Sequence, residues 1–328
     1  PIGEKFILEP APGLPAMAKN VFLFFFLLNL YLLLPGSAFA AMRVGILPAS
    51  DTIALHVAKD EGIFKKHGVE VELVPFQSAL EQGAAIRAGA LQGWFTDIIA
   101  MMVMHESGVP QYIVATMSRS GPEDPFFGIA DAPGSDNSRI ERLKGKEVAI
   151  SKATIIEYML DCMLESKGLQ RDYVRRVDIK QISVRLQLLL AGKIDAALLP
   201  EPLLSLVKAK GAQTVVDNTG LNMPLAITAL RQDAFHPAKA AAFQAALSEA
   251  MSRINADPDL YRQVMIDKRL LPREASPFYR MLHFDPASTP LPLPAEHELQ
   301  RIAEWMVQNK LLRTMPNVRN MLHDITKQ

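Results

Sequence analysis

The residues best suited to bind a small molecule follow the expected strands of this 328-residue chain. In open α/β sheets, ligands bind beyond the carboxyl ends of the strands. Small or polar side chains gather at those positions, as a pocket with a few placed hydrogen-bonding groups requires. The candidate ligand-binding residues are Ser50, Asp51, Gln77, Trp94, Thr96, Asp97, Ser118, Ser151, Lys152, Thr154 and Glu201.

The turn from Ser151 to Thr154 carries the strongest signal among them. It joins an expected strand to an expected helix, and Thr154-x-x-Glu157 fits a capping box. Free N–H groups at a helix start bind an anionic or acceptor atom. The alternative is that Thr154 only caps the helix, and the two roles are compatible. Asp51 and Asp97 also precede expected helices, where capping alone would account for them.

Two further candidates have alternatives of the same kind. Glu201-Pro202 opens an expected helix, and proline suits the first helical position. Trp94 lies on an expected central strand, where it either packs in the core or stacks on a flat ligand.

Other chemistries find no support, so we expect no catalytic residue, metal or cofactor. The chain has no G-x-S-x-G or G-x-x-x-x-G-K motif. Its single cysteine, Cys162, excludes an internal disulfide and lies in an apolar helical stretch, which is typical of a buried small side chain. No i, i+4 pair that would suit zinc occurs among the histidines, which are His56, His67, His105, His236, His283, His297 and His323.

Composition narrows the class of protein further. Apolar residues make up 49% of the chain and charged residues 21%, which excludes a disordered chain. Lys and Arg number 35 and Asp and Glu 35, so the zero net charge gives no support for nucleic-acid binding.

Strand and helix signals alternate, which predicts mostly parallel sheets flanked by helices. The expected strands cover 43–47, 69–76, 91–95, 111–117, 147–150, 174–179, 194–199, 214–216 and 225–230. The expected helices cover 52–66, 78–88, 98–105, 154–167, 183–191, 203–210 and 237–256. Glycines and prolines interrupt this rhythm over 118–137, which predicts a loop crossing into a second lobe.

A short internal repeat predicts two lobes of similar build. IRAGALQGWFTD over 86–97 aligns with LLAGKIDAALLP over 189–200, which pairs Gly89 with Gly192. We expect one lobe from 41–121, a second from 122–221, and a return to the first over 222–328 with C-terminal helices. Residues 286–294 are expected to form a proline-rich loop.

The N-terminal region predicts an export signal. Lys19 precedes an apolar run over 21–34 that is too short for a comfortable membrane span, and Ala38-Phe39-Ala40 fits a cleavage site. We expect cleavage after Ala40 and a soluble periplasmic product; a retained anchor is the alternative. Residues 1–16 fit no part of a signal peptide, and Met17 is a candidate start.

Four segments together resemble the periplasmic solute-binding proteins of ABC importers, in the nitrate, sulfonate, taurine and thiamine-pyrimidine group. They are RVGILPASDTIALHVAKDEGIFKKHGVEVELVPF, AAIRAGALQGWFTDI, ISKATIIEYML and LLAGKIDAALLPEP. The resemblance covers about 42–256. It implies a type II binding protein with two α/β lobes, two crossing strands and a ligand cleft. It also implies closure around the ligand and delivery to a membrane permease with its ATPase.

The resemblance places the ligand site at Ser50-Asp51, Thr96-Asp97, the Ser151 to Thr154 turn and Glu201. Two departures stand out: Gln92 replaces the aspartate usual in this family, and no arginine is apparent in the pocket.

The rim residues indicate the charge of the ligand. Asp51, Asp97 and Glu201 face one cation, Lys152. A carboxylate 4 Å from an anionic ligand costs about 4 kcal/mol at an effective dielectric constant of 20. We therefore expect a small polar or heteroaromatic, largely uncharged ligand; a sulfonate, taurine or nitrate anion is the alternative.

Two other functions compete with solute binding. One is an enzyme of the same fold that forms a pyrimidine precursor of thiamine, but that family uses a cysteine-rich motif and a histidine inside the cell. The other is a ligand-sensing subunit. We expect a monomeric binding protein without enzyme activity, with hinges near 118–125 and 218–224.

Overall fold

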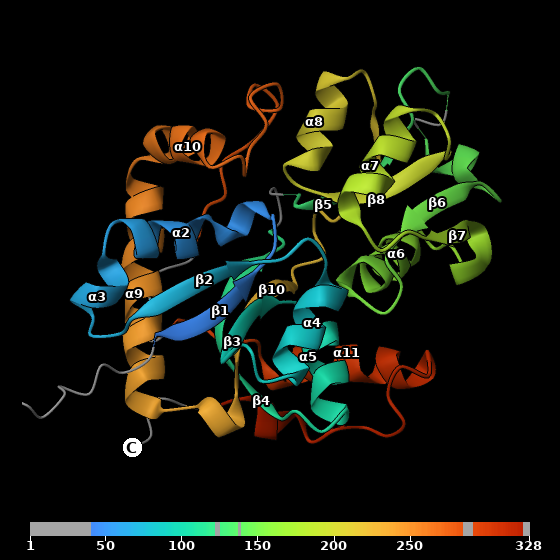
Figure 1. Ribbon diagram of the computed structural model, residues 1–328. Helices are drawn as coiled ribbons and strands as arrows, with labels where there is room; N and C mark the ends of the chain where they lie inside the picture. Colours follow the sequence, from blue (N-terminus) through green and yellow to red (C-terminus); the bar gives the residue numbers. More distant parts are fainter. Residues whose placement is uncertain (1–40, 122–124, 137–138, 285–290, 324–328) are drawn as a thin grey trace, which may run out of the picture. The chain divides into compact units, whose positions relative to one another are not determined.

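The computed structural model describes residues 41–121, 125–136, 139–284 and 291–323 (Figure 1). The predicted signal peptide and cleavage site lie outside the described residues. Within the described residues, the strands form two five-stranded sheets with helices packed around them. None of the helices described is both long enough and apolar enough to cross a membrane.

The first sheet has the order β2-β1-β3-β10-β4. Strands β2, β1 and β3 are parallel, whereas β10 is antiparallel to both of its neighbours. The prediction of a mostly parallel sheet is therefore confirmed. Its strands are β1 (Met42–Ile46), β2 (Val71–Pro75), β3 (Gly93–Thr96), β4 (Gln111–Arg119) and β10 (Pro224–Arg231). Its helices include α2 (Ile53–Asp60), α3 (Ile63–Lys66), α4 (Ala79–Arg87), α5 (Ile98–Glu106) and α9 (Pro237–Ala256).

The second sheet has the order β7-β6-β8-β5-β9, with β5 as its antiparallel strand. Its strands are β5 (Phe127–Asp131), β6 (Glu147–Ile150), β7 (Arg175–Asp178), β8 (Ala196–Pro200) and β9 (Thr214–Asp217). The helices that follow its strands are α6 (Ile155–Ser166), α7 (Ile182–Leu190) and α8 (Leu203–Ala209).

Strand β5 corrects the prediction of a loop over 118–137. All five of its residues are buried, so the alternation that marks a half-exposed strand is absent. Gly128 lies between β8 and β9, where a Cβ atom would come within 3.2 Å of Leu204 and of the Val216 carbonyl. A glycine that sequence reasoning takes as a turn signal therefore lets the backbones approach within a sheet.

The repeat predicted from 86–97 and 189–200 is confirmed by topology. The two sheets have the same order, and β3 and β8 hold equivalent places in it. Gly89 and Gly192 end the preceding helices at φ of 74° and 62°, in the left-handed region that favours glycine.

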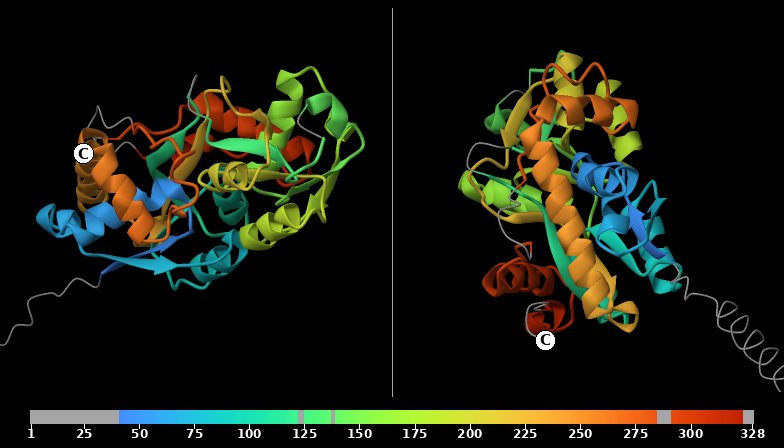
Figure 2. Two further views of the ribbon diagram at one scale, coloured as in Figure 1. Left: turned by 90° about the horizontal axis from the view of Figure 1, so that it is seen from above. Right: turned by 90° about the vertical axis from the view of Figure 1, so that its left-hand side faces the viewer.

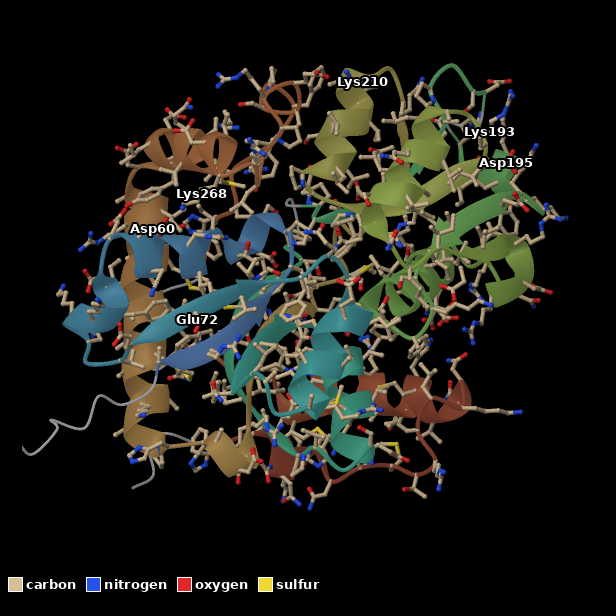
Figure 3. The ribbon with its side chains drawn as sticks, viewed as in Figure 1. Asp60, Glu72, Lys193, Asp195, Lys210 and Lys268 are labelled. Carbon is tan, nitrogen blue, oxygen red and sulfur yellow. The ribbon has the colours of Figure 1, made fainter. Side chains whose placement is uncertain are left out.

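The C-terminal region attaches to both halves of the chain. The long helix α9 lies against α2 and α3 (Figure 2). Lys268, just after α10 (Pro258–Asp267), pairs with Asp60 of α2 (Figure 3). Helix α11 (Glu296–Gln308) packs on α5, while its Trp305 donates a hydrogen bond of 2.7 Å to Asp161 of α6.

Gly93→Ala tests the close approach of β3 and β10. A Cβ at Gly93 would lie 2.8 Å from the Ala229 carbonyl oxygen, which is backbone of the neighbouring strand. We expect a loss of about 1–3 kcal/mol in the free energy of unfolding, because the strands must separate locally. Chemical denaturation measures this loss.

Gly83→Ala is the matched control for this substitution. Its Cβ would meet the flexible end of Met104 at 3.2 Å and the Trp94 ring at 3.9 Å, which is an ordinary contact. Alanine is favoured over glycine in a helix by about 0.5–1 kcal/mol. Equal losses in the two variants would contradict the account of Gly93.

Candidate ligand-binding site

A cavity of about 110 Å³ lies where the carboxyl ends of both sheets meet. Residues that follow β1 and β3 line it from the first sheet, and residues that follow β6 and β7 line it from the second. Of the predicted site residues, it brings together Thr96, Asp97, Ser151 and Thr154. Its other lining residues are Leu47, Pro48, Ala49, Ser78, Ala79, Phe95, Phe126, Phe127, Ile155, Ile156, Lys180, Ile182, Arg185 and Pro200.

The walls of this cavity are mainly apolar. Phe95, Phe126 and Phe127 contribute aromatic rings, and Ile155 and Ile182 add aliphatic surface. Apolar walls with a few polar groups are typical of small-molecule sites, because burial supplies affinity and the polar groups fix orientation.

Asp97 is the carboxylate on the first-sheet side of the cavity. It accepts a hydrogen bond of 2.8 Å from the backbone N–H of Ala100 and so caps α5, as predicted. Burial raises the pKa of Asp97 to about 6, against the opposing effect of the N–H groups of Ala100, Ile155 and Ile99. Ile155 begins α6 of the second half, so Asp97 faces the starts of two helices.

The Ser151 to Thr154 turn also caps a helix while it lines the cavity. Thr154 Oγ1 accepts from the N–H of Ile156 at 3.2 Å, and Glu157 Oε2 accepts from the N–H of Ala153 at 2.9 Å. The prediction that Thr154 caps the helix is thus confirmed. In a standard capping box the glutamate accepts from the N–H of the capping residue, whereas here Glu157 accepts from the residue before it.

Trp94 and Lys152 line a neighbouring cavity of about 490 Å³ instead. It shares Ser151 and Thr154 with the smaller cavity, so the two adjoin. Trp94 is 1% exposed, and its indole N–H donates to Gln111 Oε1 at 2.6 Å, which fixes the ring in the core. Of the two roles predicted for Trp94, the structure shows packing in the core.

Ser50, Asp51 and Ser118 are buried outside this cavity, beside the half-buried Glu201. Ser118 Oγ donates to Asp51 Oδ2 at 2.6 Å, and Ser50 Oγ donates to the Glu201 carbonyl at 3.3 Å. The prediction that Asp51 caps a helix is wrong, because Asp51 lies inside a short 3₁₀ turn over Ser50–Thr52 whose cap is Ala49. Burial raises the pKa of Asp51 to about 6, against the opposing bond from Ser118.

Two other predicted residues act at helix starts outside the cavity. Glu201 Oε2 accepts from the N–H of Ser205 at 3.2 Å. Helix α8 begins at Leu203, so Pro202 occupies the capping position rather than the first helical one, which corrects the prediction. The Gln77 N–H donates to Glu81 Oε2 at 3.3 Å, beside Ser78, which caps α4.

Sequence reasoning missed Arg185, and the expectation that no arginine lines the pocket is wrong. Arg185 is the single charged residue of α7, whose sequence is ISVRLQLLL. A charge inside an otherwise apolar helix was the signal available in the sequence. Lys180 was also missed; its Nζ donates to the Lys152 carbonyl at 2.7 Å.

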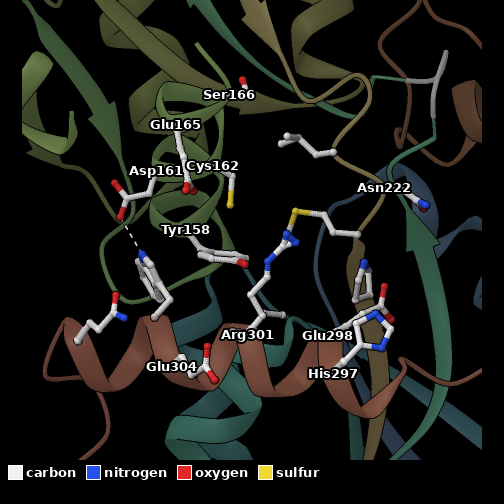
Figure 4. Close-up of a pocket in the computed structure, with 16 residues that line it drawn as sticks. Tyr158, Asp161, Cys162, Glu165, Ser166, Asn222, His297, Glu298, Arg301 and Glu304 are labelled. Atoms are coloured by element: carbon white, nitrogen blue, oxygen red, sulfur yellow. Dashed lines mark hydrogen bonds between the residues drawn. The ribbon is translucent and has the colours of Figure 1, made fainter. Parts of the chain in front are cut away.

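A larger cavity of about 470 Å³ lies elsewhere, between α6, α11 and the segment before β10 (Figure 4). Several of its polar groups already have partners: Asp161 accepts from Trp305, and Glu298 pairs with Arg119. It does not lie at strand ends, so we do not assign the solute to it. No cluster of three or more His, Cys, Asp or Glu side chains able to hold a metal occurs in the described parts of the chain.

Comparison with known proteins gives this geometry a family. The model of the NMT1-like family matches residues 37–266. The chain belongs to the NMT1-like family. A Haemophilus influenzae relative that bears the name of a thiamine biosynthesis protein is 26% identical over 310 residues, which cover 88% of this chain and 93% of the relative.

Solved structures show that this NMT1-like protein has the fold of periplasmic solute-binding proteins, which confirms the predicted resemblance. The alkanesulfonate-binding protein SsuA of Xanthomonas axonopodis pv. citri, bound to MOPS, has a TM-score of 0.72 and 18% identity, over 87% of this chain and 98% of SsuA. The nitrate-binding protein NrtA of Synechocystis has a TM-score of 0.59 and 17% identity, over 73% and 69%.

Asp51→Asn tests the cost of burying a carboxylate. The pKa of Asp51 is higher in the folded protein than its ordinary value of 3.8, so the folded state binds the proton more tightly. Ionised Asp51 therefore lowers the free energy of unfolding above pH 6, by about 3 kcal/mol, and this loss fades as the pH falls toward 4. We expect the variant to raise Tm at pH 7.5 and to raise it less at pH 4.5.

Asp131→Asn serves as the comparison in the same melts. Asp131 is also buried, but it accepts bonds of 2.7 and 2.8 Å from Gln213 and Ser135. An amide there still accepts from Gln213 but loses the negative charge that strengthens both bonds, so we expect lower Tm at both pH values. A drop in Tm at pH 7.5 for Asp51→Asn would contradict the account of Asp51.

Proposed function

We propose that this NMT1-like protein is the exported substrate-binding subunit of an ABC-type importer. It captures a small polar or heteroaromatic solute and delivers it to the membrane permease. The observation that carries this proposal is the cavity at the strand ends, which both sheets line. A solute there touches both halves of the chain at once.

Lobe closure is the proposed mechanism of capture. The proposed lobes are 41–121 with 222–328, and 122–221, and the chain passes from one sheet to the other between β4 and β5 and between β9 and β10. Contacts between the halves include the bond from Ser50 to Glu201 and an ion pair of Lys210 with Glu274. A solute that contacts both lobes only when they meet shifts the population toward the closed form.

The cavity walls suit a flat ring with polar edges. Phe95, Phe126 and Phe127 offer surface for an aromatic or heteroaromatic ring. The Asp97 carboxylate offers an acceptor for an N–H group of the ligand. The names of two structural neighbours favour the alternative of an anion, since one binds alkanesulfonates and another binds nitrate.

An enzyme of thiamine-precursor synthesis is the second candidate, and the name of the Haemophilus influenzae relative favours it. The cysteine and histidine side chains that such an enzyme uses are not found at this cavity. Neither cysteine nor histidine is among the residues that line the cavity. Cys162 lies on α6 at the larger cavity, and burial raises the pKa of its thiol to about 11, which leaves it protonated and unreactive at neutral pH. A free sensing subunit would use the same cavity without delivering the solute.

Native mass spectrometry of the protein purified from a periplasm tests the proposal first. We expect a mature chain that begins near residue 41 and carries a bound small molecule. Adding that molecule back to the stripped protein should reduce the radius of gyration in solution scattering. A chain that binds a solute with no change in scattering would contradict lobe closure.

The Asp97→Ala substitution should weaken binding of that solute about 10- to 100-fold, because a hydrogen bond to a charged group is lost from the cavity. Calorimetry with the co-purified molecule measures the change. Asp257→Ala is the control: Asp257 also caps a helix, through a bond of 3.1 Å from Leu260, but it lies outside the cavity. Equal affinities for the two variants would remove Asp97 from the site.

A further inference from the structure

Arg185 is a buried cation on the cavity wall with unused hydrogen-bonding capacity. Its side chain is 0% exposed. Nη1 donates to the Ile179 carbonyl at 3.2 Å. Nε and Nη2 have no hydrogen-bond partner among the residues that the structure describes.

The surroundings of Arg185 do not neutralise it. Burial lowers the pKa of Arg185 to about 10, with Asp178 acting in the other direction, so the guanidinium stays charged at pH 7. The oxygens of Asp178 are engaged elsewhere, by the Lys152 N–H at 3.0 Å and by Lys180 Nζ at 3.3 Å. A buried charge without a bonded counter-charge is costly, and such groups are found where a partner binds.

The two unpartnered donors have a specific geometry. In a planar guanidinium, Nε–H and one Nη2–H point the same way from one edge, at the spacing of two oxygens of an oxyanion. This edge is the fork with which arginine holds carboxylates and sulfonates through two parallel hydrogen bonds. A neutral ring nitrogen or carbonyl would satisfy only one of the two donors.

We propose that the solute is a small organic oxyanion, a carboxylate or a sulfonate, whose charged group binds the Nε–Nη2 edge of Arg185. This inference rests on the proposed function, because it names the class of solute that the cavity takes. It replaces the expectation of a largely uncharged ligand, which assumed that no arginine lines the pocket. Lys180 lies on the same wall but already pairs with Asp178.

The cavity also limits the size of the solute. Its volume of about 110 Å³ is below the ~150 Å³ of an engineered cavity that holds benzene. The oxyanion therefore carries a short chain or at most one small ring, and a longer group would extend into the adjoining cavity of about 490 Å³.

Arg185→Met separates a binding role from a structural one. Methionine fills a similar volume without charge. In buffer free of organic anions we expect Tm to rise by about 2–4 °C, because an unpaired buried charge is removed. Arg176→Met is the matched control: Arg176 pairs with Asp161, so the same substitution there should lower Tm.

Binding is measured with methanesulfonate and acetate as probes, and with dimethyl sulfone and acetamide as their neutral counterparts. We expect both anions to raise the Tm of the wild-type protein more than their neutral counterparts do. In Arg185→Met the affinity for the anions should fall about 10- to 100-fold. In Arg185→Lys it should fall by less, because the charge remains and the fork is lost.

Three outcomes would overturn the role of Arg185: neutral probes that bind as well as the anions, anions that bind Arg185→Met as well as wild type, or anions without effect on the wild type. A lower Tm for Arg185→Met, like that of Arg176→Met, would also overturn it. Solution scattering keeps the proposed function distinct. A neutral probe that closes the lobes would contradict only the proposal that the solute is an oxyanion. An anion that binds through Arg185 without closing the lobes would contradict only the proposed importer role.

Discussion

The exchange of one strand between the two sheets is the constraint on which the site depends. Strand β5 enters the second sheet directly after the chain leaves β4 of the first, and β10 enters the first sheet directly after β9 of the second. Each entering strand lies antiparallel between two strands of its new sheet. The chain thus crosses twice between the sheets, and residues that follow β1, β3, β6 and β7 line a common cavity.

Local sequence rules predicted the elements well where one residue type controls the backbone. Glycines at 89 and 192 end helices in the left-handed conformation, and β6 and α9 have the predicted bounds. Strand β5 was not predicted because both of its faces pack in the core, so its sequence carries no alternation. Periodicity alone does not separate such a strand from a loop rich in glycine and proline.

The site was predicted in part for the same reason. Asp97 and Thr154 cap helices through bonds to residues two or three positions away, so their positions follow from sequence. Asp51 binds Ser118, 67 residues away, and this contact overrides the capping rule. The position of Arg185 at the cavity could not be predicted from the sequence. The sequence shows that apolar residues flank Arg185 on its helix, but not that a cavity lies beside it.

Charge is divided across the cavity in a way that favours a ligand with two different ends. The first-sheet side presents the Asp97 carboxylate, and the second-sheet side presents Arg185 and Lys180. No ion pair between Asp97 and Arg185 is among the contacts of the described residues, although both line one cavity of about 110 Å³. Burial disfavours the charged form of each group, raising the pKa of Asp97 and lowering that of Arg185. A solute with an N–H donor at one end and an oxyanion at the other would offset both costs at once, as the proposed lobe closure requires.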